Sequence, residues 1–501
     1  MHALRRSALT AVVGALLSVA ILAILSRLLT PRDFGVVGIA MIFVGVIDAT
    51  GRLGIGPAIV QRPGLTERHV ATGFVLSATL GAVLSAAVWF ASPAVGRFFI
   101  DAEAPAILGG LSAVFVITGL GEVSQHLLRR QLRFGRLMLA SLVSQVAGYG
   151  LVAIALAMQG FGPWSLVGGL LARRALFTAV ALTSQPPPLR AKLSRHAAAQ
   201  LLQIGTGFSV SALMAAIAGH GARFAIASGL GAAPLGHYTQ AWRVAGAPNR
   251  LGNVLHSVLF PAMAERQERI DRLRPVYLHG MEITSLLAIP ASVLFVLCAP
   301  EIIAVLFGPQ WDAAVPVLKI LGAGTVFHAC NIIDVTTIRA LGAVYREAWR
   351  KALFALLMVF GVWLGVRWGL AGAAAAIIAA RILLHLLLTH LALDLLGLRW
   401  RRLLRCHAPA LWAAAWSAAA LWAATGLADR AALPAAATLA IGLGAWAAAA
   451  AAAVYTAPAF ARPRSVPWLL AHLPFTELGT TGRLLRVILE RLDPAPASRI
   501  R

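Results

Sequence analysis

Long apolar segments alternate with short polar connections along nearly the whole chain. Each apolar segment is roughly 20 residues long, the length that an α-helix needs to cross the hydrocarbon core of a bilayer. The pattern therefore predicts an all-α polytopic membrane protein with about fourteen transmembrane helices. The predicted spans are residues 7–29, 34–56, 70–92, 105–127, 137–159, 163–184, 203–228, 234–260, 276–298, 313–338, 352–366, 369–397, 408–426 and 433–457.

Composition agrees with the membrane class. Of the 501 residues, 59% are hydrophobic and only 12% are charged, whereas soluble domains carry about 25% charged residues. Arg5 and Arg6 precede the first apolar segment as they would in a signal peptide, but further spans follow at once, so we expect a transmembrane helix there. The three cysteines lack CxxC spacing, so neither a disulfide framework nor a metal site is expected. No cofactor is expected either.

Basic residues collect in alternate connections. The chain holds 43 Lys plus Arg against 19 Asp plus Glu. One set of connections and both chain ends carry most of the basic residues outside the spans, and the other set carries only Arg32, Arg97, Arg367 and Arg430. Because basic loops stay in the cytoplasm, both termini are expected there, with an even number of spans. The basic clusters are short and form no basic domain, so nucleic acid is not an expected partner.

An internal repeat is visible in two segments. LLTPRDFGVVGIA (residues 28–40, the first hairpin) resembles GLGAAPLGHYTQA (residues 229–241, the second hairpin) when Gly35 is aligned with Gly236. In the first hairpin, Thr30 is expected to cap the next helix, with Pro31 in its first turn and Asp33 at the capping-box position. The second hairpin keeps the proline and the glycine but lacks the Thr and the Asp, so we expect it to be less firmly capped.

Three further matches occur in the same order along the chain. GPAIVQR (56–62) matches FPAMAER (260–266), LLRRQLRFGR (127–136) matches TIRALGAVYR (337–346), and FGPWSLVGGLLARR (161–174) matches WGLAGAAAAIIAAR (368–381). Together they predict two pseudo-symmetric six-helix lobes in a parallel repeat, an arrangement typical of alternating-access transporters.

The repeat also predicts the division of the chain. Residues 1–200 are expected to form an N-lobe of helices 1–6 followed by a cytoplasmic linker, and residues 201–400 a C-lobe of helices 7–12. Residues 401–460 add helices 13 and 14, and residues 461–501 form a cytoplasmic tail. Within the linker, Gln185 to Gln200 opens with three prolines and is expected to continue as a short basic amphipathic helix on the membrane surface.

Several arginines lie inside the predicted spans, where an Arg at mid-membrane costs about 2.5–3.5 kcal/mol. They are therefore expected to face a protein interior or a water-filled cavity, and the surplus of positive charge predicts an anionic substrate. The planar guanidinium fork suits phosphate oxygens. The acidic residues of the spans are few: Asp48, Glu122, Glu282, Asp334 and Asp394.

Some of these charges are better candidates for substrate binding than others. Arg27 and Arg339 lie near span ends and can instead extend to the interface. Asp48 lies four residues before Arg52, so a local ion pair competes with ligand binding for this arginine. The predicted cavity cations are Arg52, Arg223, Arg243, Arg250, Arg174 and its repeat partner Arg381, with Asp48 and Asp334 as charge partners or coupling residues.

Four segments resemble the polysaccharide transporter branch of the multidrug/oligosaccharidyl-lipid/polysaccharide (MOP) exporter superfamily. They are RLLTPRDFGVVGIA, LGIGPAIVQRPGLTERH, LLRRQLRF and LGHYTQAWRVAGAPNRLGNVLHSVLFPAMAER, and the resemblance covers roughly Arg27 to Leu396. Two positions depart from the family pattern: Arg52 stands where many relatives have an acidic residue, and Ala222-Arg223 where many have Asp-Asn. Both departures make the interior more basic.

The resemblance implies a MATE-like fold and a flippase of the bacterial inner membrane. The implied cargo is an undecaprenyl-pyrophosphate-linked repeat unit of O-antigen, capsule or exopolysaccharide. Membrane lipids and a polysaccharide polymerase or export machinery are the further implied partners. The resemblance also implies that the seventh and eighth helices line the central cavity, and that the protein is a transporter without enzymatic activity.

Three alternatives remain open at this point. A lipid II flippase differs from the first interpretation only in its cargo. A cation-coupled multidrug exporter of the MATE type would need acidic residues in a cavity that is here expected to be basic. A membrane glycosyltransferase or polymerase usually carries a sizeable outer loop with catalytic residues, and such an enzyme would leave the repeat unexplained.

Overall fold

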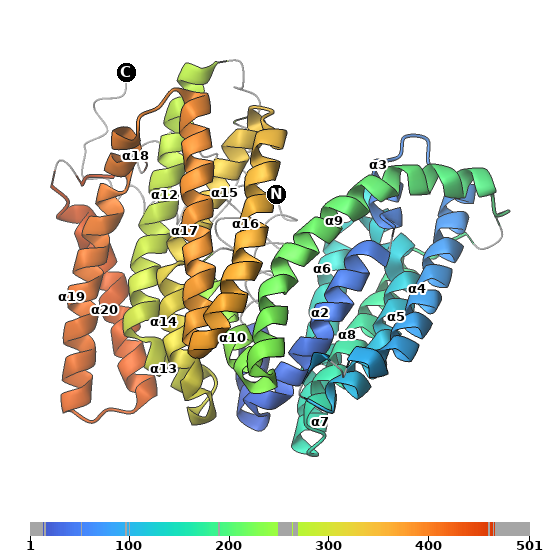
Figure 1. Ribbon diagram of the computed structural model, residues 1–501, viewed down its shortest axis with the longest axis horizontal. Helices are drawn as coiled ribbons and strands as arrows, with labels where there is room; N and C mark the ends of the chain where they lie inside the picture. Colours follow the sequence, from blue (N-terminus) through green and yellow to red (C-terminus); the bar gives the residue numbers. More distant parts are fainter. Residues whose placement is uncertain are drawn as a thin grey trace. The chain divides into compact units, whose positions relative to one another are not determined.

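The computed structural model describes Gly14 and residues 17–51, 53–95, 98–99, 101–188, 191–248, 263, 269–458, 461–463 and 465. Helices joined by short turns make up this part of the chain, and no strand occurs in it (Figure 1). The all-α prediction is confirmed. The chain divides into two compact units, residues 2–237 and residues 238–501.

The described part of the first unit includes a helix over residues 17–28, and the unit ends within α10. In it α4 packs on α5, α5 on α8, and α2 on α9 (Figure 1). The short helix α3 lies against α5 and α9, where Ile55, Ile59, Val123 and Leu201 form a buried core. The helices are α2 (Pro31–Gly51), α3 (Ile55–Gln61), α4 (Glu67–Val95), α5 (Ala104–Arg130), α6 (Phe134–Val143), η2 (Ser144–Leu151), α7 (Val152–Met158), α8 (Pro163–Ser184), α9 (Arg195–Leu230) and α10 (Ala232–Ala245).

The second unit is built around α12, which packs against α15 and α19. α16 and α17 pack side by side, as do α19 and α20 (Figure 1). The helices are α12 (Ile270–Leu297), α13 (Ala299–Leu306), η3 (Pro309–Ala314), α14 (Val315–Ala323), α15 (Thr325–Ala340), α16 (Val344–Gly365), η4 (Val366–Trp368), α17 (Gly369–Leu396), α18 (Trp400–Cys406), α19 (Ala408–Arg430) and α20 (Ala435–Tyr455).

By length and apolar composition, nine helical segments of the described chain could cross a membrane, or up to ten if a sharply bent pair counts as one span. One of the nine, Tyr345–Leu396, covers α17 and all of α16 except its first residue. The 36-residue helix α9 is not among them. The protein is therefore a multi-pass membrane protein, and the count of fourteen stays a prediction.

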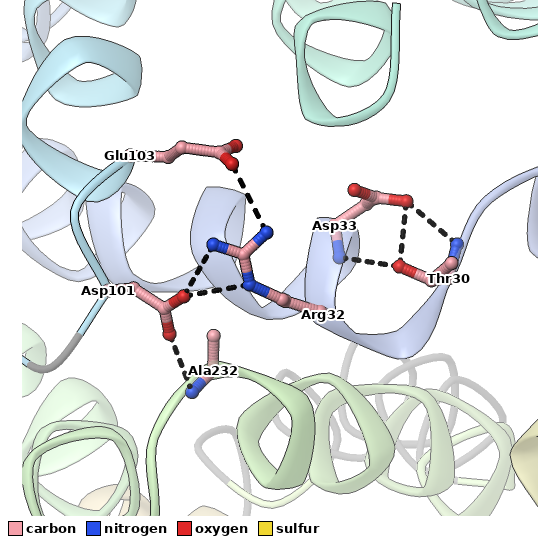
Figure 2. Close-up of polar contacts among 6 residues, drawn as sticks. All are labelled: Thr30, Arg32, Asp33, Asp101, Glu103 and Ala232. Atoms are coloured by element: carbon pink, nitrogen blue, oxygen red, sulfur yellow. Dashed lines mark hydrogen bonds and ion pairs between the residues drawn. The ribbon is translucent and has the colours of Figure 1, made fainter. Parts of the chain in front are cut away.

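The first hairpin has the expected cap. The helix over residues 17–28 and α2 turn by 119° across a short break. The Thr30 backbone N–H and hydroxyl both donate to an oxygen of the Asp33 carboxylate at 2.8 Å, and the Asp33 N–H donates back to the Thr30 hydroxyl at 3.2 Å (Figure 2). These reciprocal bonds satisfy backbone donors that a helix start leaves without partners. The predicted capping role of Thr30 and Asp33 is confirmed.

The second hairpin obtains its cap from elsewhere in the chain. The N–H of Ala232, the first residue of α10, donates to the Asp101 carboxylate at 3.3 Å (Figure 2). The same carboxylate accepts from Arg32 at 2.9 Å, and Arg32 also pairs with Glu103 at 3.1 Å. The local cap is absent, as expected, and a carboxylate distant in sequence binds this helix start instead.

The linker differs from its expected form. Residues 185–188 and 191–194 are not helical, and α9 begins directly at Arg195. The Ser194 hydroxyl accepts a bond from the Ala197 N–H at 3.3 Å, so Ser194 caps α9. The three prolines before it restrict their preceding residues to extended conformations. Instead of a separate surface helix, the last residues of this segment form the first turns of a long helix.

Candidate functional site

The structure describes six of the eight predicted site residues. Arg52 and Arg250 lie outside the described residues. The first unit contains Asp48, Arg174 and Arg223, and the second unit contains Arg243, Asp334 and Arg381.

Among the predicted cations, Arg381 stacks on an aromatic ring and borders a small cavity. It lies on α17, and its guanidinium carbon is 4.3 Å from the centre of the Trp242 ring on α10. A small cavity beside the pair is also lined by Thr325. The indole face attracts the cation and holds its plane. The Nε of Arg381 is buried and has no hydrogen-bond partner among the described residues, so an N–H donor remains for a ligand.

Arg243 follows Trp242 on α10 but is exposed. Its guanidinium donates to the Gln240 amide oxygen at 3.3 Å. Successive helix residues are about 100° apart around the axis, so Trp242 and Arg243 cannot share a face. Arg243 is thus exposed and bonded to its own helix, whereas the half-buried Arg381 stacks on a ring from another helix.

Asp334 is fully buried inside the second unit. Its carboxylate accepts hydrogen bonds from the Tyr277 hydroxyl at 2.9 Å and from the Thr389 hydroxyl at 2.8 Å. The His385 Nδ1 lies 3.6 Å from the carboxylate and 3.1 Å from the Asn331 amide oxygen. This network joins α12, α15 and α17. Its two donors satisfy a carboxylate that would otherwise be costly to bury.

The first unit contains a second buried polar group that sequence reasoning did not assemble. Glu122 and His126 lie one turn apart on α5, both buried, with the His126 Nδ1 at 3.4 Å from the Glu122 carboxylate. Glu122 and the predicted residue Asp48 line the same small cavity of about 20 Å³. The four-residue spacing of Glu122 and His126 was the available sequence signal.

The remaining predicted cations of the first unit lie in different surroundings. Arg174 on α8 is exposed. Arg223 on α9 is half-buried, and one turn before it is His220, whose Nδ1 is buried without a partner in the described chain. Also on α8, the backbone of the neighbouring Arg173 packs tightly against Gly148 of η2. The segment η2 is a π-helix, and π-helical turns are frequent at functional sites. The repeat partners Arg174 and Arg381 thus differ in burial.

Several residues of these groups were not predicted from the sequence. Trp242 contacts Arg381 from a different helix. Tyr277, His385 and Thr389 all contact Asp334, also from other helices. The sequence of α10 does not indicate which cation stacks on Trp242, because that cation, Arg381, lies on α17.

Sequence comparisons find similarity to proteins named for polysaccharide biosynthesis. A family profile described as "Polysaccharide biosynthesis protein" matches residues 24–316. The lipopolysaccharide biosynthesis protein WzxC of Escherichia coli (strain K12) is 23% identical over 302 residues, which are 60% of this chain and 61% of the relative. The succinoglycan biosynthesis transport protein ExoT of Rhizobium meliloti (strain 1021) is 27% identical over 302 residues, 60% of each chain. The chain therefore spans about three-fifths of the length of these relatives.

Solved structures show a similar fold. The lipid II flippase MurJ in an inward closed conformation superimposes with a TM-score of 0.69 at 13% identity, covering 89% of this chain and 98% of that one. An inward-facing MATE family transporter of the MOP superfamily gives 0.63 at 18% identity, covering 77% and 94%. At these identities the likeness concerns the fold alone, and the predicted MATE-like fold is confirmed.

Proposed function

The chain belongs to the polysaccharide biosynthesis protein family, and we propose that it is a flippase for polyprenyl-pyrophosphate-linked oligosaccharides. Three findings support this: the multi-pass helical architecture, relatives named for lipopolysaccharide biosynthesis and succinoglycan transport, and a fold like those of a lipid II flippase and a MATE transporter. The cargo would be an undecaprenyl-pyrophosphate-linked repeat unit of O-antigen, capsule or exopolysaccharide. It would cross the bacterial inner membrane by alternating access.

The stacking of Arg381 on Trp242 carries the proposal. A guanidinium inside a membrane protein is costly unless an anion or a cavity compensates it. Trp242 covers one face of this guanidinium, and its buried Nε–H has no partner within the described part of the chain, so we assign this donor to the ligand. A pyrophosphate presents several oxygens that the guanidinium can bind in a bidentate manner. Because the ring already holds the cation, binding costs less side-chain entropy.

The other predicted cations have a supporting role in this proposal. Arg243 is exposed and can reach a headgroup, while Arg52, Arg174, Arg223 and Arg250 add positive charge to a basic central cavity. The buried Asp334 network would act as a coupling or charge-balancing element. Both termini would lie in the cytoplasm, as the alternation of basic connections indicates, and a polysaccharide polymerase or export machinery would receive the cargo.

A transport assay with Arg381 variants tests this. The purified full-length protein is reconstituted into proteoliposomes, and inward or outward movement of a fluorescent polyprenyl-pyrophosphate oligosaccharide is followed. We expect Arg381→Gln to lower the translocation rate about 10- to 100-fold, because a hydrogen bond to a charged group contributes about 1.5–3 kcal/mol. Arg381→Lys keeps the charge but loses the fork, so an intermediate rate is expected.

The chain offers a matched control. Arg367 lies over the Trp363 ring at 5.5 Å and is exposed in the connection between α16 and α17. Arg367→Gln removes the same stacked cation outside the proposed site and should leave the rate unchanged. Wild-type rates in Arg381→Gln would overturn the role of Arg381. If the protein transports lipid II or a cationic drug and not the oligosaccharide carrier, the assignment of the cargo is overturned.

A further inference from the structure

A pocket of about 630 Å³ with several charged and polar lining residues lies in the first unit, and none of the residues considered as site residues so far lines it. Its walls come from two segments that are far apart in sequence: the start of α4, residues 66–69, and the linker with the start of α9, residues 191–197. The alternation of basic connections assigns both segments to the cytoplasmic side of the membrane.

The pocket walls carry two exposed cations, Arg68 and Lys192. Neither has a hydrogen-bonding or acidic partner within the described part of the chain. His69 and His196 also line the pocket, and the single carboxylate in the lining is Glu67. Because α4 and α9 also begin here, the positive ends of two helix dipoles add to the same potential. The pocket is therefore suited to an anion.

Three hydrogen bonds join the α9 side of the pocket to the chain around the start of α4, and a fourth lies within α9. The Gln200 amide oxygen lies 3.0 Å from the His69 Nε2 and accepts from Arg62 at 2.6 Å. The Gln200 amide nitrogen lies 2.7 Å from the His196 Nε2, and the Ser194 N–H donates to the Thr72 hydroxyl at 3.1 Å. A site built in advance loses little entropy on binding.

The position of the pocket favours a lipid headgroup over a soluble anion. It lies at the start of α4, a 29-residue helix long and apolar enough to cross the membrane, so we infer that it lies at the depth of the lipid headgroups. Leu193, next to Lys192, is 59% exposed. An exposed leucine beside a lysine is typical of a segment that inserts its apolar side chain at the interface while the cation meets phosphate.

We propose that this pocket binds the phosphate of an anionic phospholipid from the cytoplasmic leaflet, with Arg68 and Lys192 as its principal ligands. The lipid connects the start of α4 to the start of α9, and so fixes the junction where the linker enters the long helix. Phosphatidylglycerol satisfies this chemistry, whereas zwitterionic phosphatidylcholine neutralises its own phosphate. The site is separate from the cargo site and does not depend on which cargo is carried.

Native mass spectrometry of the full-length protein in detergent tests the proposal, with phosphatidylglycerol and phosphatidylcholine as the added lipids. We expect wild-type protein to retain one phosphatidylglycerol with an affinity at least about tenfold above that for phosphatidylcholine, since each basic residue near anionic headgroups contributes about a factor of five. The double variant Arg68→Gln/Lys192→Gln should lose this preference. The charge-conserving variant Arg68→Lys/Lys192→Arg should keep it, which separates loss of charge from misfolding.

A matched control removes two exposed cations from the same predicted side of the membrane. Arg401→Gln/Arg402→Gln on α18 changes the charge equally but touches no part of this pocket, so the preference should remain. An equal loss of the lipid preference in this control would show that general surface charge, and not this pocket, causes the preference. Full retention of the preference in Arg68→Gln/Lys192→Gln would also overturn the site. Displacement of the lipid by about 10 mM inorganic phosphate would identify a soluble anion as the ligand and overturn the lipid assignment.

Discussion

The first hairpin (residues 28–40) and the second hairpin (residues 229–241) begin their helices by different means. Thr30 and Asp33 of the first hairpin cap α2 with groups three residues apart. In the second hairpin the N–H of Ala232 is bound by Asp101, which lies between α4 and α5 (Figure 2). One helix start is therefore complete in its own sequence, and the other depends on a residue 131 positions away.

The packing of the two hairpins is alike where their capping differs. A Cβ atom added to Gly35 would collide with the backbone of Ala232, and one added to Gly236 would collide with the backbone of Pro31. The alignment that pairs Gly35 with Gly236 also pairs Pro31 with Ala232, so the two contacts are equivalent. Such reciprocity is the mark of a self-complementary contact. Close backbone packing is common to both hairpins, whereas the helix cap is particular to each.

Substitution of either glycine should have the largest effect. Gly35→Val and Gly236→Val each force a side chain into space held by backbone, which cannot move aside as a flexible side chain can. We expect each to destabilise the protein by about 2–4 kcal/mol, at or above the upper end for overpacked cores. Thermal unfolding of the full-length protein in detergent would measure this. If the contacts are equivalent, the two variants should lower the melting temperature by similar amounts.

A helical glycine in open surroundings serves as the control for these variants. Gly426 on α19 has no atom near its hypothetical Cβ. Gly426→Ala should be neutral or stabilising by about 0.5–1 kcal/mol, because alanine restricts the unfolded chain. A melting temperature of Gly35→Val equal to that of the wild type would contradict the close approach of the two hairpins.

Removal of the Asp101 carboxylate, which binds both Arg32 and Ala232, should cause the second largest loss of stability. Asp101 is the better buried partner of Arg32, with its side chain 14% exposed against 48% for Glu103, and it alone also binds Ala232. We expect Asp101→Asn to cost about 1–2 kcal/mol, and Glu103→Gln at most about 0.5 kcal/mol, since exposed ion pairs contribute little. The same thermal measurement at low and high salt would compare them. Equal losses in the two variants would show that α10 does not depend on Asp101.

These contrasts show what the sequence could predict. The membrane class, the helical fold and the cap of the first hairpin all depend on spacings within a few residues, such as Thr30 to Asp33, and local periodicity reports them directly. The supporting partners depend on tertiary packing. Asp101 at Ala232 and Trp242 under Arg381 join segments whose separation along the chain carries no pattern. Arg174 and Arg381 matched in the repeat, yet one is exposed and the other stacked on a ring from another helix.

Loss of the Thr30 cap should destabilise the protein less than the glycine or Asp101 variants. Thr30→Ala removes the hydroxyl that accepts from the Asp33 N–H, while the Thr30 backbone bond to the Asp33 carboxylate survives. We expect a cost of about 1 kcal/mol, the usual value for a capping threonine, and little change for Thr30→Ser. Because no described contact joins Thr30 to Asp101, Thr30→Ala combined with Asp101→Asn should destabilise the protein by the sum of the single effects. A combined loss of stability well above that sum would show that the start of α2, capped by Thr30, and the start of α10, bound by Asp101, stabilise one another.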